Sequence, residues 1–347
     1  MNQQSKKIFE PLVIVSNASS GGGAEKAMLA LHQEFINKGV DCHLIALNQS
    51  LPSSNVYNLR VLNRNWKDGI VSTYLSFLHL RKILKEINPK SLIVNCELPE
   101  LYISLMRLKQ IRIIVVEHTT YPWYKKRALG LFVRELLKIK KTEWVTVSKN
   151  KNYVWHATGI PRYIPNPFTD INKSVRQNSE ESSLVFIGGM KENKRPEWVI
   201  MAALKNNLEV NIFGTGDLED YLKKKYAKYP HLIKFNGYRE NVWEQVPKRS
   251  LVIVPSVFEG DGMVVVEATI LGFPLLLSSN IDLLRFGFQD KHYFRDFDDL
   301  ICKIARNKNN GFSDLIVDDK AREVLLVNRS VKTIASMWQE FLLEGNP

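Results

Sequence analysis

Residues 255–268 read Pro-Ser-Val-Phe-Glu-Gly-Asp-Gly-Met-Val-Val-Val-Glu-Ala and join a predicted strand to a predicted helix. The strand is the continuous apolar run Leu251–Val254, which is typical of a strand buried on both faces of a parallel sheet. The helix is expected over Met263–Leu271, because Gly272 and Pro274 follow it. This strand–turn–helix unit predicts an open α/β sheet, in which ligands bind beyond the carboxyl ends of the strands.

Two glutamates stand eight positions apart in this segment. Glu259 is expected at the end of the strand, and Glu267 one to two turns into the helix, so their carboxylates can reach different parts of one ligand. Gly260 and Gly262 let backbone amides approach that ligand, and the helix N-terminus favours a phosphate. The pattern suits an anionic ligand with hydroxyls at both ends, such as a nucleotide sugar.

The segment resembles the E-x7-E signature of glycosyltransferase family 4, whose members are retaining enzymes with the GT-B fold. The resemblance covers nearly the whole chain and is densest after residue 184. It implies transfer of a sugar from a nucleotide donor, with the leaving phosphate taking the acceptor proton. Glu259 would face the donor sugar and Glu267 the ribose. The backbone between them would contact sugar hydroxyls and phosphate through Gly260, Asp261, Gly262, Met263 and Val264.

Apolar runs of strand length alternate with helical periodicity along the chain, which predicts two parallel-sheet domains in tandem. Strands are expected over 12–15, 42–47, 92–94, 113–116, 144–147, 184–187, 210–213, 233–235, 251–254 and 274–278. Helices are expected over 24–37, 74–87, 125–140 and from 196, with polar linker residues over 172–183. The resemblance implies an α/β GT-B fold whose two Rossmann-like domains face each other across a cleft. The acceptor domain would span 1–168 and the nucleotide-sugar domain 169–330, and the helix in 331–347 would return to the first domain.

The overall composition gives no sign of a membrane span or of a secreted protein. Apolar stretches are only of strand length, and no apolar region follows Lys6 and Lys7 as in a signal peptide. Cys42, Cys96 and Cys302 have neither disulfide nor metal spacing, which favours a reducing, cytoplasmic location.

The chain carries a net charge of +12, which predicts a polyanionic partner. Nucleic acid, an anionic bilayer and a phosphorylated substrate all qualify by charge. No zinc-finger, RNP or helix-turn-helix pattern favours nucleic acid. We therefore expect a nucleotide-sugar donor, a glycan or lipid-linked glycan acceptor, and peripheral contact with the cytoplasmic face of a membrane.

Three glycine-containing turns are further candidates for the donor site. Gly22 and Gly23 open the first helix and resemble the family's GGxE turn, which faces the donor. Gly214 and Gly216 resemble a turn that lies beside the nucleotide, and Gly188 belongs to the first turn of the second domain. Each turn could equally be a tight connection between strand and helix.

The basic run after Gly188 resembles the place where the family reads G-R-L-x-x-x-K and grips the donor pyrophosphate. Lys194 matches the lysine, whereas Gly189 stands where the family has arginine. Arg195 or Lys191 could supply the missing charge, or the segment could be an ordinary solvated turn.

His118 follows the predicted strand over 113–116. It matches a histidine that in the family lies near the donor sugar and the reacting centre, although a histidine at a strand end is often only a structural hydrogen bonder. We therefore group it with Glu259 and Lys194 as a catalytic candidate, without assigning it as a general base.

The helix over 125–140 is rich in cations. At about 100° per residue, Arg127, Arg134, Lys138 and Lys141 fall on one face. The opposite face holds Leu129, Phe132, Val133 and Leu136. This pattern predicts a helix that docks on the core and presents cations to an acceptor phosphate or a membrane, unless it is simply a solvated amphipathic helix. It resembles a basic helix of family members that extend lipid-pyrophosphate-linked oligosaccharides.

No catalytic metal and no cofactor besides the nucleotide sugar is expected. Asp296-Phe297-Asp298 is a literal DxD motif, but it precedes a predicted helix and is interpreted as a cap. The seven histidines show no ligand spacing such as HExxH. Two other functions stay open: a GT-B sugar-nucleotide epimerase, which needs no acceptor, and a non-enzymatic polyanion binder, suggested by charge alone.

Overall fold

The computed structural model describes residues 11–19, 21–48, 56–64, 69–119, 122–123, 126–148, 161–169, 182–281 and 287–344. It divides the chain into two compact α/β units. The first comprises Met1–Thr169 with Arg329–Pro347, and the second comprises Asp170–Asn328. Most of the predicted linker over 172–183 lies outside the described residues.

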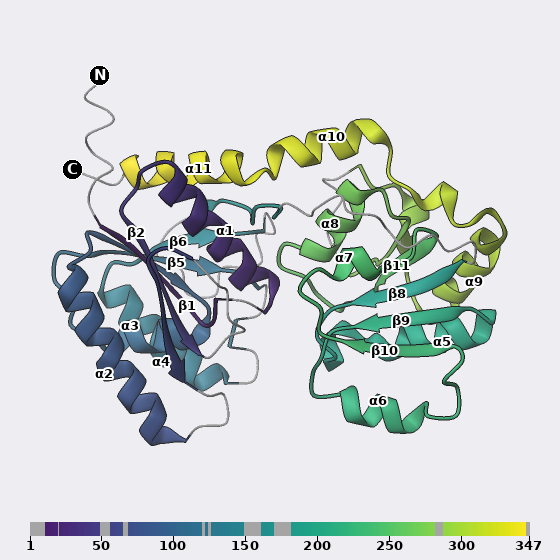
Figure 1. Cartoon of the computed structure of the whole chain (residues 1–347), viewed down its shortest axis with the longest axis horizontal. Coiled ribbons are helices and arrows are strands. Elements are labelled where there is room, and N and C mark those ends of the chain that lie inside the picture. The colour runs from purple at the N-terminus through teal and green to yellow at the C-terminus, as the bar shows by residue number, and fades with distance from the viewer. Residues whose placement is uncertain are drawn as a thin grey trace. The chain divides into compact units, whose positions relative to one another are not determined.

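The first unit is built on a parallel sheet with the strand order β3-β2-β1-β4-β5-β6-β7. Its strands are β1 Leu12–Ser16, β2 Cys42–Asn48, β3 Leu59–Arg64, β4 Ser91–Asn95, β5 Arg112–Glu117, β6 Glu143–Thr146 and β7 Arg162–Tyr163. Its helices are α1 Gly23–Asn37, α2 Ile70–Ile87, α3 Glu97–Leu105, α4 Arg127–Ile139 and α11 Val331–Glu344. Figure 1 shows these helices on the two faces of the sheet.

Alternating side chains of the strands face the two helical layers, as the pleat of a strand requires. Leu12 and Ile14 of β1 pack with residues of α1 and α11, whereas Val13 and Val15 pack with residues of α2, α3 and α4. Arg112 holds α11 in place by donating to the carbonyl oxygens of its last turns, at 3.0 Å and 2.7 Å. The final helix is therefore part of the first unit.

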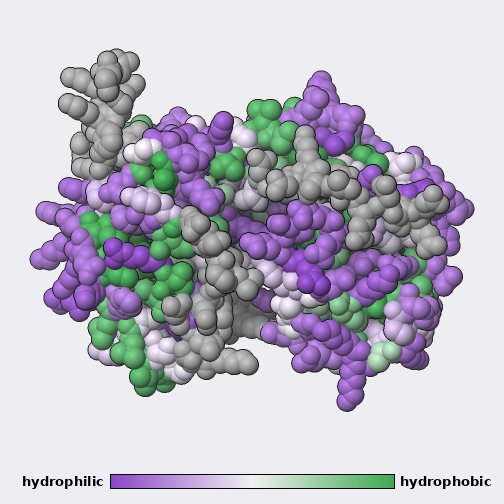
Figure 2. All heavy atoms as spheres, viewed as in Figure 1, coloured by the Kyte–Doolittle hydropathy of each residue, from purple (hydrophilic) through white to green (hydrophobic). Residues whose placement is uncertain are grey.

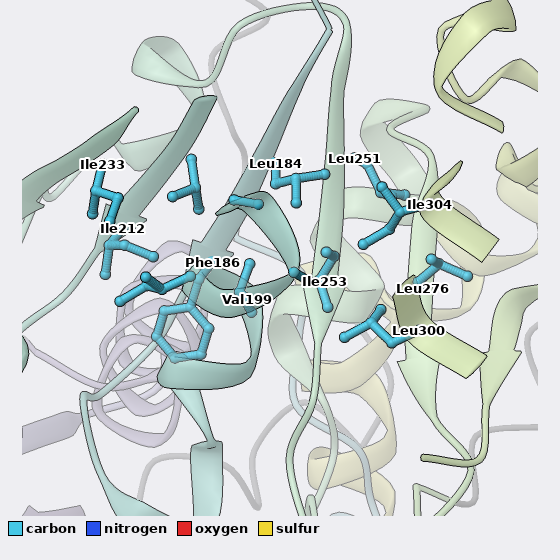
Figure 3. Packing of buried hydrophobic residues seen from close by; sticks show 14 of the residues in the cluster. Leu184, Phe186, Val199, Ile212, Ile233, Leu251, Ile253, Leu276, Leu300 and Ile304 are labelled. Carbon is cyan, nitrogen blue, oxygen red and sulfur yellow. The ribbon is translucent and has the colours of Figure 1, made fainter. Parts of the chain in front are cut away.

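The second unit is built on a parallel sheet with the strand order β10-β9-β8-β11-β12-β13. Its strands are β8 Ser183–Ile187, β9 Glu209–Phe213, β10 Ile233–Gly237, β11 Ser250–Val254, β12 Leu275–Ser278 and β13 Tyr293–Phe294. Its α-helices are α5 Pro196–Asn206, α6 Glu219–Lys225, α7 Val242–Gln245, α8 Met263–Leu271, α9 Phe297–Asn307 and α10 Asp319–Asn328. Figure 3 shows Phe186 and Ile253 from the strands packing with Val199 of α5 and Leu300 of α9.

Each sheet has one point where the order of its strands reverses. In the first unit β1 lies between β2 and β4, and in the second unit β8 lies between β9 and β11. Loops that leave two such strands diverge, which opens a crevice at their carboxyl ends. The positions that matter for binding are therefore the loops after β1 and β4, and the loops after β8 and β11.

The prediction of parallel-sheet α/β domains is confirmed, with two main differences in detail. The predicted helix over 74–87 begins four residues earlier, at Ile70, and its first turns expose apolar side chains that give no burial pattern. The helix α3 was not predicted, because it is short and carries Pro99 in its first turn. Among the described residues, no helix has both the length and the apolar composition needed to span a bilayer.

Candidate active site

The loops after β8 and β11 are joined by a charged cluster. Lys194 Nζ donates to Glu259 Oε1 at 2.6 Å, and Ser256 Oγ donates to the same oxygen at 2.6 Å. The Val257 amide donates to the Asn193 carbonyl oxygen at 2.8 Å, which ties the two loops together. The fold thus brings two of the predicted catalytic residues into contact at the switch point of the second sheet.

Both Glu259 and Lys194 can still form hydrogen bonds with a ligand. Within the described part of the chain, Glu259 Oε2 has no hydrogen-bond partner, and Lys194 uses only one of its ammonium hydrogens. Their side chains are 14% and 28% exposed, so a ligand can still reach both. The pair can therefore offer an acceptor to a hydroxyl and a cation to a phosphate over a short distance.

The helix α8 begins directly after this cluster. Gly262 precedes it with a φ of +66°, a left-handed conformation that favours glycine. The amides of Val265 and Val266 bond to the Gly262 carbonyl oxygen at 2.8 Å and 3.1 Å. The amides of Met263 and Val264 have no acceptor among the described residues, so they are available to an anion.

Glu267 lies about one turn into α8, and its carboxylate is held by a tryptophan. Trp243 Nε1 donates to Glu267 Oε2 at 2.8 Å. Trp243 is buried on α7, and its ring packs on Phe273 with the ring centres 5.3 Å apart. The sequence analysis missed Trp243, because nothing in its spacing from Glu267 signals this contact.

The turns after β8 and β9 pack backbone against backbone. A Cβ atom added to Gly214 would lie 2.0 Å from the Gly188 carbonyl oxygen, and one added to Gly216 would lie 2.6 Å from that of Met190. The Met190 amide also donates to the Thr215 carbonyl oxygen at 2.9 Å. The glycines at 214 and 216 are therefore required for this close approach, and their contact with a donor stays a prediction.

Besides Lys194, two cations near Gly189 could supply the charge missing from the predicted phosphate clamp. Arg195 follows a 3₁₀ turn over Glu192–Lys194, and its guanidinium stacks on the Trp198 ring at 4.5 Å. Lys191 is exposed. Neither side chain has an acidic partner in the part of the chain that the structure describes, so both remain candidates to replace the family's arginine.

The loops after β1 and β4 meet in the first unit. Gly22 precedes α1, Gly23 is its first residue, and a Cβ atom on Gly22 would lie 2.7 Å from Glu25 Oε2. Glu25 Oε1 in turn accepts from Cys96 Sγ, just after β4, at 4.0 Å. The glycine turn thus lies at the switch point of this sheet.

A cavity of about 500 Å³ opens at the ends of β4 and β5 in the first unit. Its lining includes Asn17, Arg64, Glu97, Glu117, His118 and Lys126. Both ring nitrogens of His118 are buried and have no partner among the described residues. Burial lowers the pKa of His118 to about 4, so the ring is neutral near pH 7 and offers one donor and one acceptor.

Arg134 does not belong to an exposed basic face, so that prediction is wrong. The side chain is buried, lies 3.1 Å from Glu100 and 2.7 Å from Glu117, and covers the Trp144 ring at 4.4 Å. Burial raises the pKa of Glu117, and it raises that of Glu100 to about 7, although Arg134 opposes both shifts. The two carboxylates come from β5 and α3, and they attract Arg134 to the core in a way that helical periodicity cannot reveal.

The other predicted cations of α4 are exposed but do not converge. Arg127 starts the helix, whereas Lys138 and Lys141 line a separate cavity of about 820 Å³ beside Trp144. The apolar side of the prediction also fails in part. Leu129 and Phe132, expected in the core, are exposed, whereas Val133 is buried as predicted.

The DxD segment is a helix cap, as predicted. Asp296 Oδ1 accepts from the Asp299 amide at 2.8 Å at the start of α9. Among the described residues, no group of three or more His, Cys, Asp or Glu side chains is arranged to hold a metal ion.

Comparisons with known proteins identify the family to which the sequence is similar. The family profile described as Glycosyltransferase Family 4 matches residues 21–167, and the profile described as Glycosyl transferases group 1 matches residues 181–293. A Haemophilus influenzae protein described as an uncharacterized glycosyltransferase is 23% identical over 279 residues, which is 76% of this chain and 78% of that protein. A Campylobacter jejuni α-1,4-N-acetyl-D-galactosaminyltransferase, named for a GalNAc-containing undecaprenol-diphosphate acceptor, is 24% identical over 86% of this chain and 80% of its own length.

Solved structures share the same fold. Sucrose-phosphate synthase from Thermosynechococcus elongatus has a TM-score of 0.78 and 14% identity, covering 96% of this chain and 98% of that one. Anabaena HepE, solved with UDP-glucose, has a TM-score of 0.77 and 13% identity, covering 96% and 100%. These structures show a fold of two Rossmann-like domains of the GT-B class, and the two family profiles show that the chain belongs to the family 4 type of glycosyltransferases.

Proposed function

We propose that this enzyme transfers a hexose or N-acetylhexosamine from a UDP-linked donor to a hydroxyl of a lipid-linked glycan. The reaction would retain the anomeric configuration, require no metal and serve the synthesis of a surface glycan at the cytoplasmic face of a membrane. The observation that carries the proposal is the Lys194–Glu259–Ser256 cluster, with the α8 amides and Glu267 next to it in the same unit.

The donor assignment is supported by the chemistry of this cluster and by known structures. Glu259 Oε2 would accept from a hydroxyl of the donor sugar, and Glu267 from the ribose. Lys194 and the Met263 and Val264 amides would face the diphosphate. Anabaena HepE was solved with UDP-glucose, and the pneumococcal O-GlcNAc transferase GtfA with UDP and GlcNAc.

The residues of this chain would act mainly by stabilising charge. As the bond to the sugar breaks, negative charge develops on the leaving diphosphate, and a cation and amide hydrogens already in place lower the energy of that state. Lys194 would shift part of its interaction from Glu259 to the diphosphate. Ser256 would keep Glu259 in position meanwhile, because it donates to the same carboxylate oxygen.

The acceptor assignment is supported by the first unit and by one relative. The cavity beside His118 has charged and polar side chains among apolar ones in its lining, and the neutral imidazole would be a further polar group for a sugar hydroxyl. The Campylobacter jejuni relative is named for an undecaprenol-diphosphate-linked glycan acceptor. We therefore place the acceptor glycan in this cavity, with Glu97 and Lys126 as further polar contacts.

The proposal is tested first by ligand binding. A panel of nucleotide sugars is screened by thermal denaturation, because a ligand that binds only the folded protein raises the midpoint by mass action. UDP and one UDP-sugar should give the largest shifts. A preference for another nucleotide, or no shift with any, would refute the donor assignment.

A second test separates the two glutamates. Glu267→Ala should weaken binding of UDP itself, whereas Glu259→Ala should reduce transfer and leave UDP affinity nearly unchanged. Glu323→Ala, on the exposed side of α10, is the matched control. Equal loss of UDP affinity in the two site variants, both still folded, would contradict the proposed roles, and inversion of the product anomer would contradict retention.

A further inference from the structure

The outward face of α2 carries an apolar stripe. Its first turns expose Ile70, Val71, Tyr74, Leu75 and Leu78, with exposed fractions of 89%, 72%, 59%, 58% and 38%. At about 100° per residue, the five side chains fall within an arc of about 140°. In Figure 2, apolar side chains gather over the part of the first unit where Figure 1 places this helix.

The same face becomes basic toward the end of the helix. Arg81, Lys82 and Lys85 are exposed and continue the arc of the apolar stripe. Within the described part of the chain, their only acidic contact is a distance of 4.0 Å between Lys82 and Glu86. At about 1.5 Å per residue, these cations lie about 5–10 Å beyond Leu78 along the axis. The face is thus divided along the helix into an apolar end and a basic end.

Neighbouring helices carry further exposed apolar side chains. The α2 residue Ser76 contacts Tyr102 of α3 at 2.6 Å, and Lys140 just after α4 donates to the Met106 carbonyl oxygen just after α3 at 2.7 Å. The three helices therefore form one layer. Its other exposed apolar side chains include Leu105, Leu131 and Phe132.

The apolar end of α2 is also linked to the cavity beside His118. Arg64 lines that cavity, and its guanidinium donates to Thr73 Oγ1, in the first turn of α2, at 3.1 Å and 3.3 Å. This hydrogen bond places the first turn of α2 beside one residue of the cavity lining.

We infer that the outward face of α2 docks on an anionic bilayer. Its first turns would enter the boundary between headgroups and acyl chains, and Arg81, Lys82 and Lys85 would lie among lipid phosphates. Interfacial helices bury apolar side chains about 5–10 Å into the boundary between headgroups and acyl chains. Because the apolar and basic parts of α2 are separated along its axis, this helix would be tilted, with its first turns deeper than its cations. The inference deepens the proposed function, since it brings the cavity beside His118 to the surface where a lipid-linked acceptor is found.

A second copy of the chain fits this face less well than a bilayer. A two-fold interface places the same patch on both copies. With the two helices antiparallel, the apolar end of each would face the cations of the other, and with them parallel, the cations would face one another. A bilayer matches the apolar end and the basic end of α2 at once, because its apolar layer lies directly beneath its anionic headgroups.

The test is cosedimentation of the full chain with vesicles of phosphatidylcholine alone and of phosphatidylcholine with about one third phosphatidylglycerol. The variant Val71→Ser/Leu75→Gln/Leu78→Gln should bind the anionic vesicles at least tenfold more weakly than the unchanged chain. The variant Arg81→Gln/Lys82→Gln/Lys85→Gln should lose about fivefold per cation at low salt, and the loss should shrink as salt is added. Val324→Gln/Leu326→Gln, which alters exposed apolar residues of α10, is the matched control and should bind like the unchanged chain.

Three results would overturn the inference. The first is that the unchanged chain does not bind the vesicles, and the second is that the Val71/Leu75/Leu78 variant binds them equally well. The third is that the unchanged chain binds no vesicles but self-associates, and that this variant abolishes the self-association. The midpoint of thermal unfolding, measured for all variants, confirms that they are folded. Sugar transfer, measured separately, distinguishes the two proposals, since a chain that binds vesicles but transfers no sugar would refute the proposed function alone.

Discussion

The hydrogen bond from Trp243 to Glu267 leads to a quantitative prediction for Trp243→Phe. The change removes the indole N–H, which lies 2.8 Å from Glu267 Oε2, and keeps a ring against Phe273. A hydrogen bond to a charged group contributes about 1.5–3 kcal/mol, and water can replace part of it because Glu267 is only half-buried. The bond is present without nucleotide, so its loss acts on affinity through the position of Glu267: a weakened contact with the ribose should cost about 1–2 kcal/mol in nucleotide affinity, which corresponds to about 5–30-fold.

The kinetic signature follows from where Glu267 acts. A ribose contact is made equally in the ground state and in the transition state, so its loss should raise KM for the donor and leave kcat within about threefold. Titration calorimetry with UDP and steady-state kinetics would measure both effects. Tyr226→Phe is the matched control, because Tyr226 donates to Glu197 at 2.7 Å elsewhere in the same unit. It should change nucleotide affinity by less than about twofold, since it touches no part of the site.

A double-mutant cycle decides whether Trp243 acts through Glu267. If it does, Trp243→Phe should cost nothing further in a Glu267→Ala background, within about 0.5 kcal/mol. Additive losses in the double variant would refute the reasoning, as would a fall in kcat with an unchanged KM. A smaller ring also leaves a gap beside Phe273, so affinities must be compared well below the unfolding midpoint of each variant.

Three further predictions concern the metal, the buried carboxylates and α4. Transfer in excess chelator should stay near its untreated rate, and a loss restored by Mg²⁺ or Mn²⁺ would contradict the metal-free mechanism. Because burial raises the pKa of Glu100 to about 7, this group favours the folded state fully below its unfolded pKa, and that contribution is lost as pH rises toward 7. The unfolding free energy should thus fall by about 3 kcal/mol between pH 4.5 and 7.5 from this group, and Glu100→Gln should flatten the profile of unfolding midpoint against pH. Because Arg127, Lys138 and Lys141 do not converge, replacing them with glutamine should leave both UDP affinity and KM for a lipid-linked acceptor nearly unchanged, which acceptor titrations can check.

The fold was predictable from sequence wherever burial is continuous. Leu251–Val254 and Met263–Leu271 were placed correctly, because a strand buried on both faces and a helix ended by Gly272 each leave a local pattern. The contact between Lys194 and Glu259 is different in kind. Each residue was expected at a strand end, but only the strand order, which sets β8 beside β11, brings them within 2.6 Å.

The errors have a common physical origin, which is that helical periodicity was taken to reveal burial. Arg134 was assigned to the solvent side because it is charged, yet two carboxylates from distant segments compensate its charge in the core. Phe132 was assigned to the core because it is apolar, yet it is 54% exposed. Periodicity shows which residues share a face of a helix, but which face is buried depends on partners that are distant in sequence.

The apolar stripe of α2 is a second case in which the sequence pattern does not reveal which face of a helix is buried. Exposed apolar residues that occur singly are normal on a protein surface and need no explanation. The stripe on α2 is a different case, because five exposed apolar residues share one arc of the helix and three cations follow on the same arc. Covering these apolar side chains would release free energy that their exposure to water does not. A sequence pattern cannot distinguish such a stripe from a core-facing one. The structure can, since the buried side of α2 is already occupied by Ser76, Leu80, Ile83 and Leu84. What remains outside is a surface whose composition matches a bilayer interface and whose apolar end is joined through Arg64 to the cavity beside His118.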